Sequence, residues 1–256
     1  MPGEGRRRRL PVRSDNMGLL SPRLANVWCD GRMGATTVSD VLTRMRAISA
    51  EVPHGDGAGV FNNVYLRVTE MVANRLKTPG VFHDDAFIAD LDVRFAGYWF
   101  TAYDAARVKP KAWAPLFAAR KNKGVLPIQF ALAGMNAHIE NDLPLAVVAT
   151  CAARRRTPTS PGVREDYDKV NDLLADVEAE IRRSFLTEAE NVIDDSVEAV
   201  VHLISSWDIE KARDFAWLNV QTLWELRRIG PLYDAYTATL ASTVGMGSRL
   251  LLTSAI

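Results

Sequence analysis

From Thr37 onward, the apolar residues of this chain recur three and four positions apart, which is the spacing of one face of an α-helix. The alternation of Val, Ile and Thr that is typical of β-strands is absent. Gly- and Pro-containing breakers separate the periodic stretches. The predicted helices cover residues 38–51, 59–77, 84–107, 110–121, 126–153, 162–187, 190–205, 208–228 and 231–246. We therefore predict an all-α fold, a single multi-helix bundle of about eight or nine helices.

The N-terminal segment differs from the rest of the chain. Residues 1–33 are rich in Arg, Gly and Pro and include four consecutive arginines at 6–9. We predict that this basic segment is disordered or loosely attached, and that residues 34–256 form the helical domain. No apolar run of about 7–15 residues follows the arginines, as a secretory signal would require. We therefore expect a cytoplasmic location and no membrane partner.

The charge balance and the missing motifs exclude several classes of function. The chain has 31 basic and 31 acidic side chains, a net charge of zero, which argues against binding nucleic acid. It lacks the glycine-rich nucleotide-binding loops, the GxSxG and HExxH motifs, and the ExxH pairs of di-iron bundles. Nucleotide cofactors and serine hydrolysis are therefore not expected. The expected partner is a small-molecule ligand or substrate, and the oligomeric state is left open.

The predicted helix 126–153 is the most apolar and carries His138 and Asp142 on one face. With about 100° per residue, these two side chains lie only about 40° apart around the helix. They can bond to each other, bind one metal ion together, or act as an oriented acid–base pair. Pro144 cannot donate a backbone hydrogen bond and crowds the carbonyl of Glu140, so a kink is predicted beside the pair.

Two further charged residues fall on apolar helix faces. Asp92 lies between the two apolar faces of helix 84–107, beside Trp99. Arg213 lies within the apolar arc of helix 208–228, with Trp217 and Trp224 alongside. An arginine stacked between tryptophans is a suitable partner for a buried carboxylate or an anionic ligand. Since isolated buried charges are costly, we expect these residues to meet the His138 pair in one pocket.

The candidate site residues follow from these patterns. The catalytic candidates are His138, Asp142 and Asp92. The substrate-binding candidates are Arg213, Asn62, Asn141, Trp99, Trp217 and Met135. Purely structural roles are the alternative: the His138–Asp142 bond would then tie helices together, and Asp92 would form an ion pair with Arg213.

Five segments carry a resemblance to a known family. They are GAGVFNNVYLRVTEMV, FIADLDVRFAGYWF, REDYDKVNDLLADVE, KARDFAWLNVQTLW and the long run PKAWAPLFAARKNKGVLPIQFALAGMNAHIENDLPLAVVATC. Over residues 38–250 the chain resembles a family of actinobacterial proteins known only as a domain of unknown function, with GMNAHIENDLP as its central motif. The resemblance implies a helical protein, often encoded near metabolic genes, and no particular activity.

A second similarity concerns only two residues. The HxxxD spacing of His138 and Asp142 is similar to an element of the zinc-dependent phospholipases C, another all-helical family. The other His and Asp ligands of that family, and its N-terminal Trp, have no counterparts here. A three-zinc site is therefore not expected.

Three functions are compatible with these candidates. The first is an enzyme, a lyase, isomerase, cyclase or hydrolase of specialised metabolism, acting on a mostly apolar small molecule. In it, His138 transfers the proton, Asp142 sets its tautomer and raises its pKa, and Asp92 with Arg213 forms the polar wall. The second is a hydrolase in which His138, Asp142 and Asp92 hold one divalent metal ion, the only cofactor considered. The third is a non-catalytic carrier or sensor of a hydrophobic ligand.

Overall fold

The computed structural model describes residues 35–170, 174 and 208–253, and these contain helices and no strands. The helices are α2 (Val38–Glu51), α3 (Gly57–Arg75), α4 (Asp85–Asp104), α5 (Ala114–Ala119), α6 (Pro127–Asn136), the π-helix η1 (Ala137–Asp142), α7 (Leu143–Ala153), α10 (Ile209–Leu226) and α11 (Gly230–Leu251). Residues 163–170 are also helical. The predicted all-α class is confirmed. The predictions for residues 1–33, for helix 190–205 and for most of 171–187 lie outside the described residues.

Polar side chains begin four of these helices at the places where the sequence pattern changes. The side chains of Thr37, Asp56, Asp84 and Asp208 each accept a hydrogen bond from a backbone N–H in the first turn. At α2 the Asp40 side chain also accepts a bond from the Thr37 backbone, which completes a capping box. These bonds satisfy N–H groups that have no partner within the helix.

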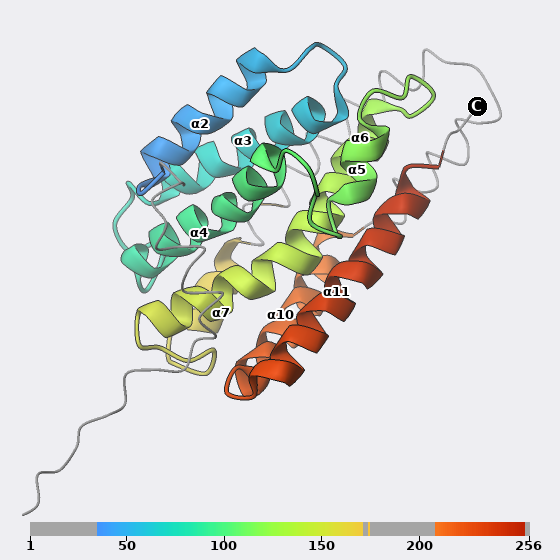
Figure 1. Ribbon diagram of the computed structural model, residues 1–256. Helices are drawn as coiled ribbons and strands as arrows, with labels where there is room; N and C mark the ends of the chain where they lie inside the picture. Colours follow the sequence, from blue (N-terminus) through green and yellow to red (C-terminus); the bar gives the residue numbers. More distant parts are fainter. Residues whose placement is uncertain (1–34, 171–173, 175–207, 254–256) are drawn as a thin grey trace, which may run out of the picture.

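A continuous helical rod, α6–η1–α7, runs through the middle of the molecule (Figure 1). α3 packs on α6 and α4 on α7, while α10 and α11 pack on the opposite side of the rod. α2 covers α3 from the outside. The rod is therefore covered on two sides, which explains why residues 127–153 are the most apolar stretch of the chain.

The apolar interior consists of two clusters that meet at the rod. The first gathers around α2, α3 and α6 and contains Trp99 and Trp113. The second gathers around α4, α7 and α10 and contains Phe87 and Tyr167. Partly buried residues that pack against both clusters are Val68, Met71, Phe95 and Met135. The junction between the two clusters is where the candidate site lies.

The close packing of α3 on α6 requires a glycine at residue 134. A Cβ atom there would lie 2.2 Å from Cδ2 of Phe61. We expect Gly134→Ala to lower the free energy of unfolding by about 1–3 kcal/mol, because the Phe61 ring must shift within a packed core. Chemical denaturation measures this change.

Gly247→Ala is the matched control within α11. Its added Cβ would meet Nδ2 of Asn136 at 3.5 Å, an ordinary contact. This variant should keep or slightly raise the stability, by up to about 1 kcal/mol of helix propensity. Equal stability of both variants would show that α3 and α6 are not closely packed at Phe61.

Candidate functional site

The candidate site is built on a local change in the helix of the rod. At η1 the backbone N–H of Leu143 donates to the carbonyl of His138, five residues earlier instead of four. Pro144 stands in the first turn of α7 and supplies no N–H of its own. A wider π-helical turn accommodates this interruption, where the sequence predicted a kinked but continuous helix. The extra residue in this turn belongs to the segment that carries His138 and Asp142.

His138 and Asp142 are both 2 % exposed and are bonded to each other. The distance from Nδ1 of His138 to Oδ2 of Asp142 is 3.0 Å. The same Oδ2 accepts from Nε1 of Trp113 at 2.8 Å, and Nδ2 of Asn141 donates to Oδ1 at 2.7 Å. Since an indole N–H can only donate, Oδ2 is an acceptor, and the proton of His138 is assigned to Nδ1. Nε2 of His138 then carries the free lone pair.

Aromatic rings surround the imidazole of His138. The Phe95 ring stacks on it with a centroid distance of 3.6 Å and an interplanar angle of 6°. The Tyr65 ring stands edge-on at 4.4 Å, with Phe61 and Trp113 further out. Burial lowers the pKa of His138 below its ordinary value, and the bond and charge of Asp142 offset this only in part. Asp142 by itself raises the pKa of His138, but burial lowers this pKa by more. The predicted net increase is therefore wrong, and the ring is neutral near pH 7.

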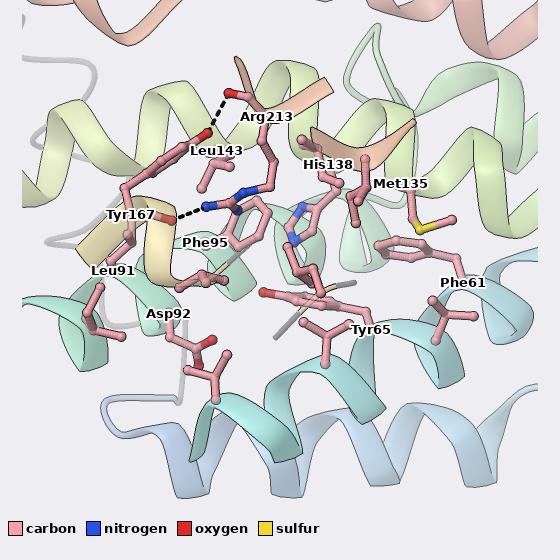
Figure 2. Close-up of a pocket in the computed structure, with 18 residues that line it drawn as sticks. Phe61, Tyr65, Leu91, Asp92, Phe95, Met135, His138, Leu143, Tyr167 and Arg213 are labelled. Carbon is pink, nitrogen blue, oxygen red and sulfur yellow. Dashed lines mark hydrogen bonds between the residues drawn. The ribbon is translucent and has the colours of Figure 1, made fainter. Parts of the chain in front are cut away.

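A cavity of about 80 Å³ lies against this imidazole at the junction of the two apolar clusters (Figure 2). Of the 18 described residues that line it, 13 are aliphatic, Met or Phe. The others are Tyr65, Asp92, His138, Tyr167 and Arg213. A single water needs only about 10–15 Å³, so the space admits a small molecule or one end of a larger one.

Asp92 brings a buried carboxyl group to the same cavity. The residue is 8 % exposed, and none of the described residues bonds to its Oδ2 atom. Burial raises the pKa of Asp92 to about 7. Near neutral pH a large share of this carboxyl is therefore protonated and able to donate a hydrogen bond.

Tyr65 adds a third polar group that the sequence patterns did not single out. Its hydroxyl is buried and has no hydrogen-bond partner among residues 35–170, 174 and 208–253. Burial, and then the charges of Asp92 and Asp142, raise the pKa of Tyr65 well above its ordinary value, against a weak opposing effect of Thr69. The hydroxyl therefore keeps its proton. Tyr65 lies on α3 one turn after Phe61, among the buried residues of that helix.

Arg213 lies at the cavity but is not placed as predicted. Its Nη2 donates to the backbone carbonyl of Tyr167 at 2.6 Å, and its guanidinium lies over the Tyr167 ring at 4.1 Å. The Tyr167 hydroxyl in turn donates to the carbonyl of Arg213 at 2.7 Å. Between the described side chains of Arg213 and Asp92 there is no ion pair. The predicted stacking between tryptophans is wrong, because Arg164 covers Trp217 and Arg227 covers Trp224.

The remaining candidates are placed apart from the lining of the cavity, except for Met135. Nε1 of Trp99 donates to Oδ1 of Asn62 at 3.0 Å, and Nδ2 of Asn62 donates to the Met45 carbonyl at 2.8 Å. These bonds connect α2, α3 and α4. Trp217 packs on Tyr167, and Asn141 holds Asp142. Asn62, Trp99 and Trp217 thus satisfy their polar groups or bury their rings within the protein itself.

The three metal-ligand candidates do not form the ligand set that the metal alternative requires. Within the described part of the chain, no group of three or more His, Cys, Asp or Glu side chains is placed to hold a metal ion. The reason is that Nδ1 of His138 and both oxygens of Asp142 already bond to protein groups. In these three side chains, Nε2 of His138 and Oδ2 of Asp92 have no hydrogen-bond partner among the described residues, and both residues line the cavity.

The fold and the site define an all-α protein in which a buried His–Asp pair and a protonatable carboxyl border one apolar cavity. The chain belongs to a family of unknown function (DUF5995), whose model matches residues 38–254. No curated protein and no solved structure matches the chain. Among the described residues, no helix is both long and apolar enough to span a membrane.

Proposed function

We propose that this protein is an enzyme that moves protons on a mostly apolar small molecule, with His138 as the general base. The observation that carries the proposal is Nε2 of His138. This atom is buried, has no hydrogen-bond partner in the described part of the chain, and belongs to a neutral imidazole at an apolar cavity. A buried polar atom without a hydrogen bond lowers the stability of the protein by about 1–3 kcal/mol. A histidine with only a structural role would bring no benefit that offsets this loss.

The surroundings of His138 suit proton transfer. Asp142 fixes the tautomer through Nδ1 and stabilises the imidazolium that forms when Nε2 takes a proton. The stacked Phe95 ring prevents the imidazole from turning away. The Asp92 carboxyl, with a pKa of about 7, is partly protonated and adds a hydrogen-bond donor at the same cavity. A base and an acid at one cavity favour isomerase, lyase or cyclase chemistry over hydrolysis.

The apolar lining also narrows the substrate. Intermediates of central metabolism mostly carry phosphate or carboxylate groups, and 13 of the 18 lining residues that the structure describes are apolar. A substrate of specialised metabolism suits this lining better. A non-catalytic carrier would use the same lining and is the second candidate.

Exchange of the acidic C–H protons of nitroethane for deuterium in heavy water separates the two candidates. Nitroethane is small enough for the cavity and needs only a base. We expect the native protein to catalyse the exchange with saturation kinetics, and faster than free imidazole at the same concentration, as measured by proton NMR. Bound alkenes without an acidic C–H should compete. An exchange rate no higher than that of free imidazole would contradict the proposed enzyme activity and favour the carrier function.

A further inference from the structure

Three buried polar atoms at one apolar cavity have no hydrogen-bond partner among the described residues. They are the hydroxyl oxygen of Tyr65, Oδ2 of Asp92 and Nε2 of His138. They come from three elements, α3, α4 and η1. Figure 2 shows Tyr65 between the other two. Other buried polar side chains of the rod donate to protein groups: Nε2 of Gln129 bonds to the carbonyls of Leu251 and Thr253, and Nδ2 of Asn136 bonds to Val244 and Ser248 of α11.

We propose that the substrate is a small ketone or enone, or a molecule with such a group at one end. Its carbonyl oxygen accepts hydrogen bonds from Tyr65 and Asp92, and the neighbouring C–H faces Nε2 of His138. This inference rests on the proposed function, because it names the substrate class for the same site.

The donor and acceptor pattern of the three atoms matches this group. The Tyr65 hydroxyl keeps its proton, and the protonated Asp92 carboxyl is a second donor. A carbonyl oxygen has two lone pairs and can accept both bonds. Nε2 of His138 is an acceptor and has nothing to offer that oxygen, so it is left for the C–H. Two donors on an apolar wall stabilise an enolate more strongly than they would in water.

The reaction balances without any further reactant. Nε2 takes the proton from the carbon next to the carbonyl, and the C–H electron pair forms the carbon–carbon double bond of an enolate. The oxygen becomes negative and holds both hydrogen bonds more strongly. In a β,γ-enone the imidazolium then returns the proton to the γ carbon, the remaining carbon–carbon double bond moves into conjugation, and the carbonyl re-forms. The product is an isomer of the substrate. A protonated carboxyl beside a tyrosine in an apolar site plays the same part in ketosteroid isomerase.

Butanone and its alkene isostere, 2-methylbut-1-ene, test the oxygen site directly. Both have the same shape, and only butanone has an oxygen. We expect the protein to bind butanone more tightly, and the C=O stretching band of bound butanone to move to lower frequency in the infrared. Tyr65→Phe and Asp92→Leu should each weaken butanone binding roughly 2- to 10-fold, leave alkene binding unchanged, and reverse part of the infrared shift. Tyr103→Phe, at a tyrosine that does not line the cavity, is the control.

His138→Asn distinguishes failure of this inference from failure of the proposed function. It should keep the preference for butanone, since the oxygen is held by the other two residues. Equal binding of ketone and alkene, no binding of either, or a preference that only His138→Asn abolishes would each overturn the carbonyl site. If butanone is bound as expected but nitroethane exchange is absent, the proposed enzyme fails and the oxygen site stands.

Discussion

Replacing His138 by Asn is expected to slow the catalysed exchange of nitroethane protons by roughly 100- to 10,000-fold. The amide Nδ2 of Asn takes the place of Nδ1 and can still donate to Asp142, which accepts that bond at 3.0 Å in the native protein. No atom of Asn reaches the position of Nε2. The substitution therefore removes the base and keeps the bond that would matter for a structural role. Proton NMR in heavy water measures the rate.

Two controls accompany this variant. Binding of 2-methylbut-1-ene should be unchanged within about 2-fold, since the apolar lining is intact, and thermal unfolding reports whether the site is still folded. His138→Gln is the complementary variant, because its amide extends toward the position of Nε2 but has no basic lone pair. If both variants remain folded and exchange nitroethane at the native rate, His138 is not the base and the Asp92 carboxylate is the next candidate.

Helix positions were predictable from sequence where a local signal marks them. The bounds predicted for α2 are those of the structure, because Thr37 and Asp40 form a capping box that the chain itself encodes. The turn of η1 was not predictable. Pro144 indicates an interruption, but a proline disturbs the backbone ladder in a kink and in a π-helical turn alike, so local spacing does not distinguish the two.

The cavity was predictable in part from helical arcs. Asp92, His138, Met135 and Arg213 were placed on inward faces of three helices, and all four line one cavity. The position of a residue on a helical arc indicates whether its side chain is buried, but not which group the side chain contacts. Asn62 and Trp99 are both buried, yet they bond to each other and not to a ligand. Trp113 holds Asp142 from 29 residues earlier in the chain, a contact that no local spacing indicates.

Replacing Asp92 by Asn is expected to stabilise the protein at pH 8 and to have little effect at pH 4. The pKa of Asp92 is raised from its ordinary value of 3.8 to about 7 by burial. Between these two values the folded state binds a proton that the unfolded state has released. The free energy of unfolding of the native protein therefore falls as the pH rises from about 4 to 7. A tenfold change in proton affinity corresponds to about 1.4 kcal/mol, so the loss attributable to Asp92 is at most about 4 kcal/mol.

Asn cannot ionise and has nearly the same shape, so it removes this loss. The measurement is the difference in free energy of unfolding between the variant and the native protein, from denaturant titrations at several pH values. The difference should grow with pH and level off above about pH 7. Other groups that face the cavity, including Tyr65, His138, Tyr167 and Arg213, are common to both proteins and cancel in the difference to first order. A difference that stays flat with pH would show that Asp92 is ionised in the folded protein.

Asp90→Asn, two residues earlier on α4, is the matched control. Asp90 forms ion pairs with Arg94 and Arg154, each at 3.1 Å, near the surface. Its replacement loses these pairs and should not raise the stability at pH 8. Opposite signs for the two variants would show that the Asp92 carboxyl is kept at a cost to stability. Such a cost is expected when a buried acid binds a ligand. If the residue at 92 served only packing, the protein would be more stable with Asn or Leu at this position.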